Sequence, residues 1–257
     1  MVLSRVRFNT NMEQNISTVT PELASEMIKV GVILAHTKAK THPKMKPFIA
    51  GNRNEVELLS PEAVMESLDL AIAFLRGVLM KSGLVLAVGT TLPAKQGISE
   101  FAKEFSFPFV TVRWLGGTLT NFKVITTRLK YFEDLKVKRE KGELQKYTKR
   151  EQLEFDKEIA QMSKIFTGLQ NLSRMPSAIF VVDAHEHAAA VREAKLLGIP
   201  VIAIMDSDDD PNTVEYPIIA SDHAKSSIEW VLTRVRDGIR GATPASPEVP
   251  TVVAVKK

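Results

Sequence analysis

Short runs of apolar residues alternate along the chain with segments of helical periodicity. The runs have strand length and are almost entirely apolar, which is typical of strands buried on both faces. They cover residues 84–88, 109–112, 178–182 and 201–204. Helices are expected at 21–30, 61–79, 94–105, 186–197 and 224–239. This alternation predicts an α/β fold of three layers, in which a parallel β-sheet of the flavodoxin or Rossmann type has helices on both faces. A further strand is expected at 55–59.

Residues 120–172 interrupt the alternation, because they contain no strand candidate and are heavily charged. Two apolar seams with steps of three and four residues run through this region, at 122–135 and 155–169, and Lys141-Gly142 marks a turn between them. The pattern predicts an inserted, protruding α-helical hairpin whose arms pair as an antiparallel coiled coil.

The two ends of the chain differ in composition from the centre. Residues 1–20 are polar and predict a flexible N-terminal extension, whereas residues 241–257 are rich in proline and small residues and predict a disordered tail. Residues 21–240 form the expected globular domain. The apolar runs are far shorter than the roughly 20 residues of a membrane-spanning helix, so no membrane partner is expected.

The charge of the chain fits a polyanionic partner, with 34 Lys+Arg against 30 Asp+Glu and a formal net charge of +4. The excess is small, so its distribution matters more than its total. Residues 36–53 contain no acid and little periodicity, which predicts an exposed, irregular basic loop. Its candidate contacts are Lys38, Lys40, His42, Lys44, Lys46 and Arg53. The absence of cysteine excludes disulfides, thiolate nucleophiles and cysteine zinc sites.

The segment 113–123, Arg-Trp-Leu-Gly-Gly-Thr-Leu-Thr-Asn-Phe-Lys, lies between an expected strand and an expected helix. Its cations can meet phosphates, its small polar side chains can bind phosphate or ribose oxygens, and the glycine pair allows a close approach. The candidates are Arg113, Trp114, Thr118, Thr120, Asn121 and Lys123, with Arg128 beyond them. A structural alternative is that Trp114 anchors the core and Gly116-Gly117 forms an ordinary turn.

Two expected strands end in a carboxylate, at Asp183 and Asp206. Parallel neighbours would bring both acids to the ligand-binding edge of the sheet, near His185, His187 and Asp208 to Asp210. One interpretation is a cation-dependent hydrolase, and another is a structural Mg²⁺ shared by Asp183 and Asp206. No nucleophile motif supports catalysis. A nucleotide-binding module is a third alternative, but Val88-Gly89-Thr90-Thr91 lacks the glycine spacing that a pyrophosphate requires.

Several separated motifs resemble the bacterial small-subunit ribosomal protein two family (universal S-two), in its order and at its spacing. They are residues 43–49 (Pro-Lys-Met-Lys-Pro-Phe-Ile), 51–54 (Gly-Asn-Arg-Asn), 113–121, 180–187 and 197–200 (Leu-Gly-Ile-Pro). The resemblance extends from about residue 28 to residue 241. The chain departs from the family's usual pattern at Ile33, where a histidine is lost, at His42, at Thr91, at Ser177 and in the loop 219–224.

The resemblance implies a non-enzymatic constituent of the small subunit in the cytoplasmic ribosome. Its implied partners are small-subunit rRNA, neighbouring small-subunit proteins and, in many bacteria, the large S-one protein. It implies that the cations and small polar residues of 113–123 bind RNA, that Asp183 is structural, and that no cofactor is required.

Overall fold

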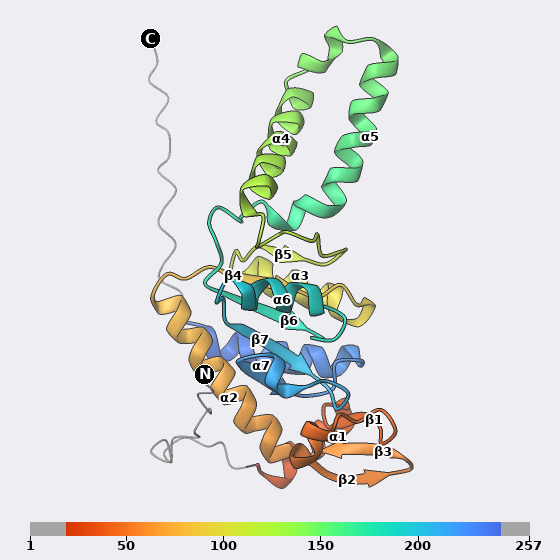
Figure 1. The fold of residues 1–257 in the computed structure, drawn as a ribbon, viewed down its shortest axis with the longest axis vertical. Coiled ribbons are helices and arrows are strands. Elements are labelled where there is room, and N and C mark those ends of the chain that lie inside the picture. The colour runs from red at the N-terminus through yellow and green to blue at the C-terminus, as the bar shows by residue number, and fades with distance from the viewer. Residues whose placement is uncertain (1–18, 243–257) are drawn as a thin grey trace.

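Five parallel strands form the central sheet, in the order β5-β4-β6-β7-β8 (Figure 1). The computed structural model describes residues 19–242, so the predicted extension and tail lie almost wholly outside the described residues. The strands are β4 (Val85–Val88), β5 (Phe109–Val110), β6 (Ala178–Val182), β7 (Val201–Met205) and β8 (Tyr216–Ile219). Because all pairs are parallel, the carboxyl ends of the strands meet at one edge of the sheet.

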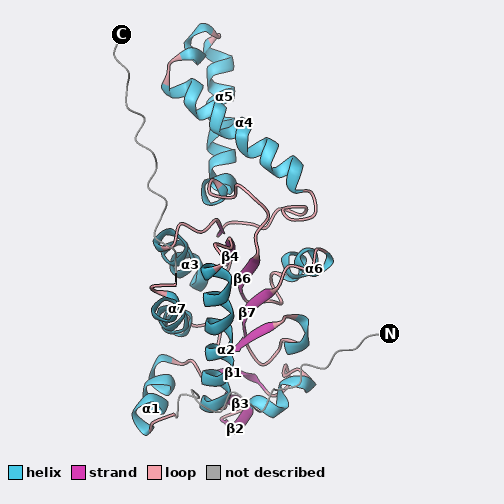
Figure 2. Cartoon of the chain, turned by 90° about the vertical axis from the view of Figure 1, so that its left-hand side faces the viewer, coloured by secondary structure: helices cyan, strands magenta, loops and turns pink. Residues whose placement is uncertain are grey.

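Helices cover both faces of this sheet, as the alternating pattern predicts (Figure 2). One face packs against α2 (Pro61–Met80), α3 (Leu92–Glu104) and α7 (Lys225–Ile239), and the other against α6 (Ala188–Leu196). Alternate residues of each strand enter the two cores; Phe180 lies in the first and Val181 in the second, and both are fully buried. The predicted parallel α/β architecture is therefore confirmed.

The strand β8 was not predicted, because Pro217 interrupts a short apolar run. Proline lacks an N–H group and is tolerated only where a ladder bond is not needed. β8 is the edge strand of the sheet and pairs on one side only, with β7. Its position at the edge therefore explains why the sequence pattern is weak there.

A second, antiparallel sheet lies beside the carboxyl edge of the first and has the order β1-β3-β2. Its strands are β1 (Leu34–Thr37), β2 (Ile49–Arg53) and β3 (Val56–Leu59), and it follows helix α1 (Pro21–Val30). The prediction of an irregular loop at 36–53 was wrong, because these residues form the end of β1, the 3-10 turn η1 (Pro43–Phe48) and β2. The segment holds one buried apolar side chain, Met45, which anchors η1 in the core.

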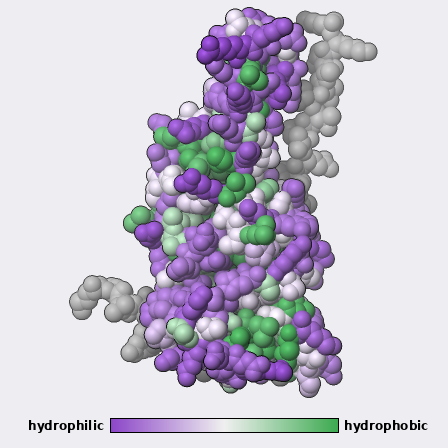
Figure 3. Space-filling view, turned by 90° about the vertical axis from the view of Figure 1, so that its right-hand side faces the viewer, coloured by the Kyte–Doolittle hydropathy of each residue, from purple (hydrophilic) through white to green (hydrophobic). Residues whose placement is uncertain are grey.

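Two long helices, α4 (Phe122–Glu140) and α5 (Lys149–Phe166), project from the end of the sheet at β5 (Figure 1). They are joined by the 3-10 turn η2 (Glu143–Lys146), and α5 is followed by η3 (Thr167–Leu169). Phe132 of α4 and Phe166 of α5 are buried together, with ring centroids 6.2 Å apart. The face of the hairpin shown in Figure 3 is mostly hydrophilic, as expected when the apolar seams face each other, although Val124, Val137 and Leu153 are exposed. The coiled-coil geometry of this pair stays a prediction.

Candidate nucleic-acid interface

The turn that follows β5 is organised around one carboxylate, that of Glu193 on α6. Its Oε1 atom accepts hydrogen bonds from Nε1 of Trp114 at 3.0 Å and from the backbone N–H of Gly117 at 2.8 Å. Its Oε2 atom accepts from the N–H of Leu119 at 3.0 Å and from both the N–H and the hydroxyl of Thr120, each at 3.1 Å. The carboxylate therefore fixes the path of the backbone between β5 and α4.

The local sequence allows the backbone to wrap around this carboxylate. Gly117 has φ of +88°, a left-handed conformation that glycine adopts without steric cost. The Thr118 hydroxyl donates to the carbonyl of Leu115 at 2.6 Å and closes the turn. Glycine and a small hydroxyl are thus required here by the fold itself.

The Glu193 side chain is nearly buried, yet it is charged at neutral pH. Burial by itself raises the pKa of this carboxyl, but the hydrogen bonds from Trp114, Thr120, Gly117 and Leu119 outweigh burial and hold the pKa below its ordinary value. Several N–H dipoles directed at one anion stabilise its charged form. The turn is consequently tied to α6 by charge-assisted hydrogen bonds.

Three residues predicted to bind RNA also hold this turn. The indole N–H of Trp114 and the hydroxyl of Thr120 both donate to Glu193, and Thr118 is 1% exposed with its hydroxyl bound to Leu115. A donor that is occupied inside the protein is not free for an RNA oxygen. The structure therefore gives all three side chains a role in the turn, and contact between them and RNA stays a prediction.

The cationic residues of the same region remain outside. Arg113, Asn121, Lys123 and Arg128 are all exposed, and Asn121 stands at the start of α4 without a side-chain capping bond. The turn thus separates the motif into an inner set that holds the backbone and an outer set that faces solvent.

The predicted basic residues of 36–53 also lie at the surface, although on regular elements. Lys38 and Lys40 follow β1, Lys46 lies in η1, and Arg53 ends β2. Two further candidates have internal partners: Nζ of Lys44 lies 2.6 Å from Asp210, and Nδ1 of His42 accepts from the N–H of Lys44 at 3.4 Å. This basic segment and the 113–123 turn lie at opposite ends of the sheet, so the structure does not join them into one patch (Figure 1).

The strand-end carboxylates Asp183 and Asp206 enter one cluster, but in separate groups. Asp183 lies with Asp209 and Asp222, whereas Asp206 lies with His36 and His223, and in each group the potential ligand atoms are within 4.8 Å of one another. No group of three or more potential ligands among the described residues contains both acids, and a Mg²⁺ ion shared by Asp183 and Asp206 stays a prediction. Of the partners, Asp209 was among the acids noted in the sequence, whereas His36, Asp222 and His223 were missed because they lie in other loops and strands.

Crowding and burial change the acidity of two of these carboxyls. Burial, reinforced by the neighbouring carboxylates Asp183, Asp208 and Asp206, raises the pKa of Asp209 to about 8. Burial and the charges of Asp183 and Asp206 raise the pKa of Asp222 to about 9. Both groups therefore carry a proton at neutral pH when no cation is present.

One of the two histidines near the strand-end carboxylates, His187, is held by hydrogen bonds inside the protein. His187 is 2% exposed, its Nε2 accepts from the N–H of Thr90 at 3.1 Å, and its Nδ1 lies 2.8 Å from the carbonyl oxygen of Asp183. These contacts require the neutral ring with its proton on Nδ1. The ring thus joins the residues that follow β4 and β6, at the edge of the sheet where an open α/β fold would bind a nucleotide. His185 is exposed.

Along residues 19–242, every helix is too short or too polar to cross a lipid bilayer.

The sequence model for the family ribosomal protein S2 matches residues 27–242. The small ribosomal subunit protein uS2 of Coprothermobacter proteolyticus is 36% identical over 214 residues, which are 83% of this chain and 80% of that protein. The protein of the same name from a Roseiflexus species is 37% identical over 211 residues, 82% of this chain and 80% of the relative. The family is structural rather than enzymatic, which removes the hydrolase interpretation. The match spans nearly all of the described residues, and the chain belongs to the ribosomal protein S2 family.

Proposed function

We propose that this protein is a constituent of the small ribosomal subunit in the cytoplasm and binds its rRNA through the outer residues of the 113–123 turn. Arg113 supports this proposal most directly. It is exposed, and among the described residues no hydrogen bond or ion pair engages its guanidinium. A free, planar guanidinium beside a rigid turn is suited to bidentate contact with a phosphate.

Gly116 supports the same proposal independently. It is exposed, its φ is not in the left-handed region, and a Cβ atom added there would meet nothing within 4 Å. The fold therefore does not require glycine at this position, unlike at Gly117. A missing side chain that the fold does not need leaves room for a phosphate-sugar backbone to approach the turn.

The basic segment 36–53 is the proposed second contact, through Lys38, Lys40, Lys46 and Arg53. This segment lies at the other end of the sheet from the 113–123 turn. The protein would therefore be bound at both ends, either by one RNA or by two separate RNA segments. The hairpin α4–α5 projects away from the body and offers a surface to rRNA or to neighbouring small-subunit proteins, which in many bacteria include the large S-one protein.

Sedimentation of cell extracts tests the assignment. The protein is expected in the small-subunit fraction at physiological salt and in the free fraction at high salt, because phosphate contacts release counterions when they form. Recovery of the protein only in the free fraction at physiological salt would contradict the proposal.

A competition between variants tests the site. Arg113→Ala should reduce incorporation into small subunits by roughly tenfold, since one phosphate or base-edge contact contributes about 1–3 kcal/mol. Arg76→Ala is the matched control, because Arg76 is likewise exposed, on α2, and lies outside both proposed contact regions. Equal incorporation of the two variants would show that the turn does not bind the RNA.

A further inference from the structure

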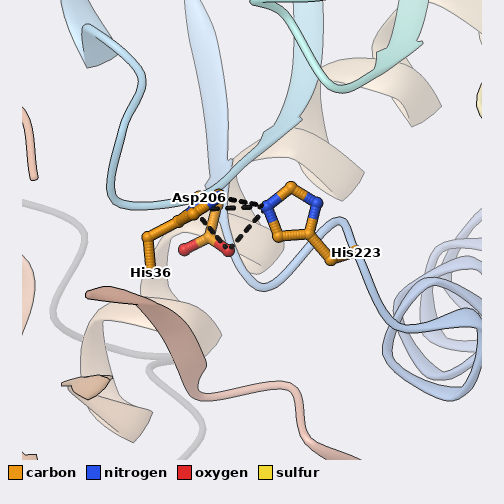
Figure 4. Close-up of side chains that lie close together, drawn as sticks. All are labelled: His36, Asp206 and His223. Atoms are coloured by element: carbon orange, nitrogen blue, oxygen red, sulfur yellow. Dashed lines mark hydrogen bonds and ion pairs between the residues drawn. The ribbon is translucent and has the colours of Figure 1, made fainter. Parts of the chain in front are cut away.

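Two histidines and one aspartate from distant parts of the chain converge at the carboxyl edge of the sheet (Figure 4). His36 lies on β1, Asp206 directly follows β7, and His223 lies in the loop before α7. Nδ1 of His36 is 3.5 Å from Oδ2 of Asp206, Nε2 of His223 is 3.8 Å from the same oxygen, and the two nitrogens are 3.2 Å apart.

These separations are those of ligands around one small metal ion. A point equidistant from three atoms that are 3.2, 3.5 and 3.8 Å apart lies about 2.0 Å from each of them, which is the length of a Zn–N or Zn–O bond. The rings meet edge to face, and Nε2 of His36 is 2.6 Å from Nε2 of His223. A slight separation of the rings would therefore admit the ion.

The aspartate of this group has a buried oxygen that makes no hydrogen bond within the described part of the chain and whose imidazole neighbours lie at 3.5 and 3.8 Å. The side chain of Asp206 is 0% exposed, and its Oδ1 accepts from the N–H of Ser207 at 2.5 Å. Its Oδ2, directed at the two imidazoles, has no hydrogen-bond partner among the described residues. A buried carboxylate oxygen without a partner is costly, and a cation bound there would remove that cost.

A second buried carboxyl group lies beside one of the rings. Oδ1 of Asp222 lies 3.2 Å from Nδ1 of His223. The His223 side chain is 54% exposed, so an ion can enter from solvent.

We propose that His36, Asp206 and His223 bind one divalent transition-metal ion, with Zn²⁺ as the expected occupant. Two imidazoles and one carboxylate suit Zn²⁺ better than Mg²⁺, which prefers oxygen ligands such as those of Asp183, Asp209 and Asp222. The ion would tie β1 of the small sheet to β7 and to the loop before α7, and so stabilise the junction between the two sheets.

Titration of the purified, full-length protein with Zn²⁺ in the presence of excess Mg²⁺ tests the site. The chain has no cysteine and five histidines, so few other side chains compete for the ion. One Zn²⁺ per chain is expected, with a rise in melting temperature that follows occupancy. Co²⁺ in place of Zn²⁺ should give the visible absorption bands of a low-coordinate site.

The variants His36→Gln and His223→Gln should each weaken Zn²⁺ binding at least tenfold and abolish the shift in melting temperature. His185→Gln, which removes an exposed histidine outside the group, should retain both. The proposal is overturned if the three variants bind Zn²⁺ equally, if the wild type binds none, or if Mg²⁺ displaces Zn²⁺ at a similar concentration. Because the His223 side chain is half exposed, loss of the fold is not expected to obscure the result.

Discussion

Replacement of Glu193 by glutamine should destabilise the protein although the two side chains have almost the same shape. The carboxylate accepts hydrogen bonds on both oxygens, from Trp114 and Gly117 on Oε1 and from Leu119 and Thr120 on Oε2. A glutamine amide can accept on only one side, since its NH₂ group is a donor. In either orientation of the glutamine amide, its NH₂ group therefore faces at least two N–H donors of the turn, which lose their acceptor.

The magnitude follows from the donors that lose their acceptor. A buried donor left without a partner costs about 1–3 kcal/mol, so two of them cost about 2–6 kcal/mol. Trp114 is only half buried, and water can partly replace its acceptor, which favours the lower part of this range. The expected loss is about 3 kcal/mol, a large fraction of the roughly 5–15 kcal/mol by which most domains are stable.

Urea denaturation at pH 7 measures this loss, with Glu186→Gln as the matched control. Glu186 lies in the loop that leads into α6 and its side chain is exposed, so its replacement should change the free energy of unfolding by less than about 0.5 kcal/mol. If Glu193→Gln is as stable as Glu186→Gln, the carboxylate does not hold the turn.

The same prediction has a dependence on pH with a definite sign. The folded-state pKa of Glu193 is lowered, so its contribution to stability is present above the unfolded value of about 4.3 and is lost as the pH falls through the folded value. The difference between the wild type and Glu193→Gln should therefore be full at pH 7 and should shrink below about pH 4. A difference that is constant with pH would mean that the charge is not involved.

Two further predictions concern single side chains. Gly116→Ala should leave the melting temperature within about 2 °C of the wild type, because the Cβ atom meets open space, yet it should reduce incorporation into small subunits in the competition assay; unchanged incorporation would contradict the proposed approach of RNA. Asp222→Asn should flatten the fall in metal-free stability between pH 5 and pH 8, measured by urea denaturation with a chelator. The folded-state pKa of about 9 exceeds the unfolded value of about 3.9, so the contribution of this carboxyl to the free energy of unfolding falls as the pH rises through this window. If the free energy of unfolding of the variant falls with pH as steeply as that of the wild type, this role is refuted.

The sheet and its covering helices were predictable because their apolar patterns are strong and local. β6 and β7 are uninterrupted apolar runs, and α2 carries a stripe from Val64 to Leu79 that is buried in the structure. The hairpin seams likewise correspond to buried side chains such as Ile125 and Ile159. The small sheet was not predicted as a whole, because β1 and β2 are exposed along most of their length and have no clean alternation.

The metal-ligand candidates could be predicted only in part, since sequence order does not show which loops meet. The strand-end position of Asp206 was visible, but its partners His36 and His223 are 170 residues before it and 17 residues after it, on elements whose packing depends on the whole fold. A histidine on a short exposed strand has no local signal that distinguishes a ligand from a surface residue.

The 113–123 motif shows why residue type alone does not identify the partner of a donor. Indole, hydroxyl and backbone N–H groups bind any oxygen anion, so the composition that suits a phosphate equally suits a carboxylate. Here Glu193, on α6 and 73 residues beyond Thr120, supplies that carboxylate and occupies these donors. Guanidinium and ammonium groups on long side chains reach past the turn, which is why Arg113 and Lys123 stay exposed. An internal anion therefore fixes the backbone that carries the external cations, and under the proposed function this would reduce the conformational entropy that RNA binding must overcome.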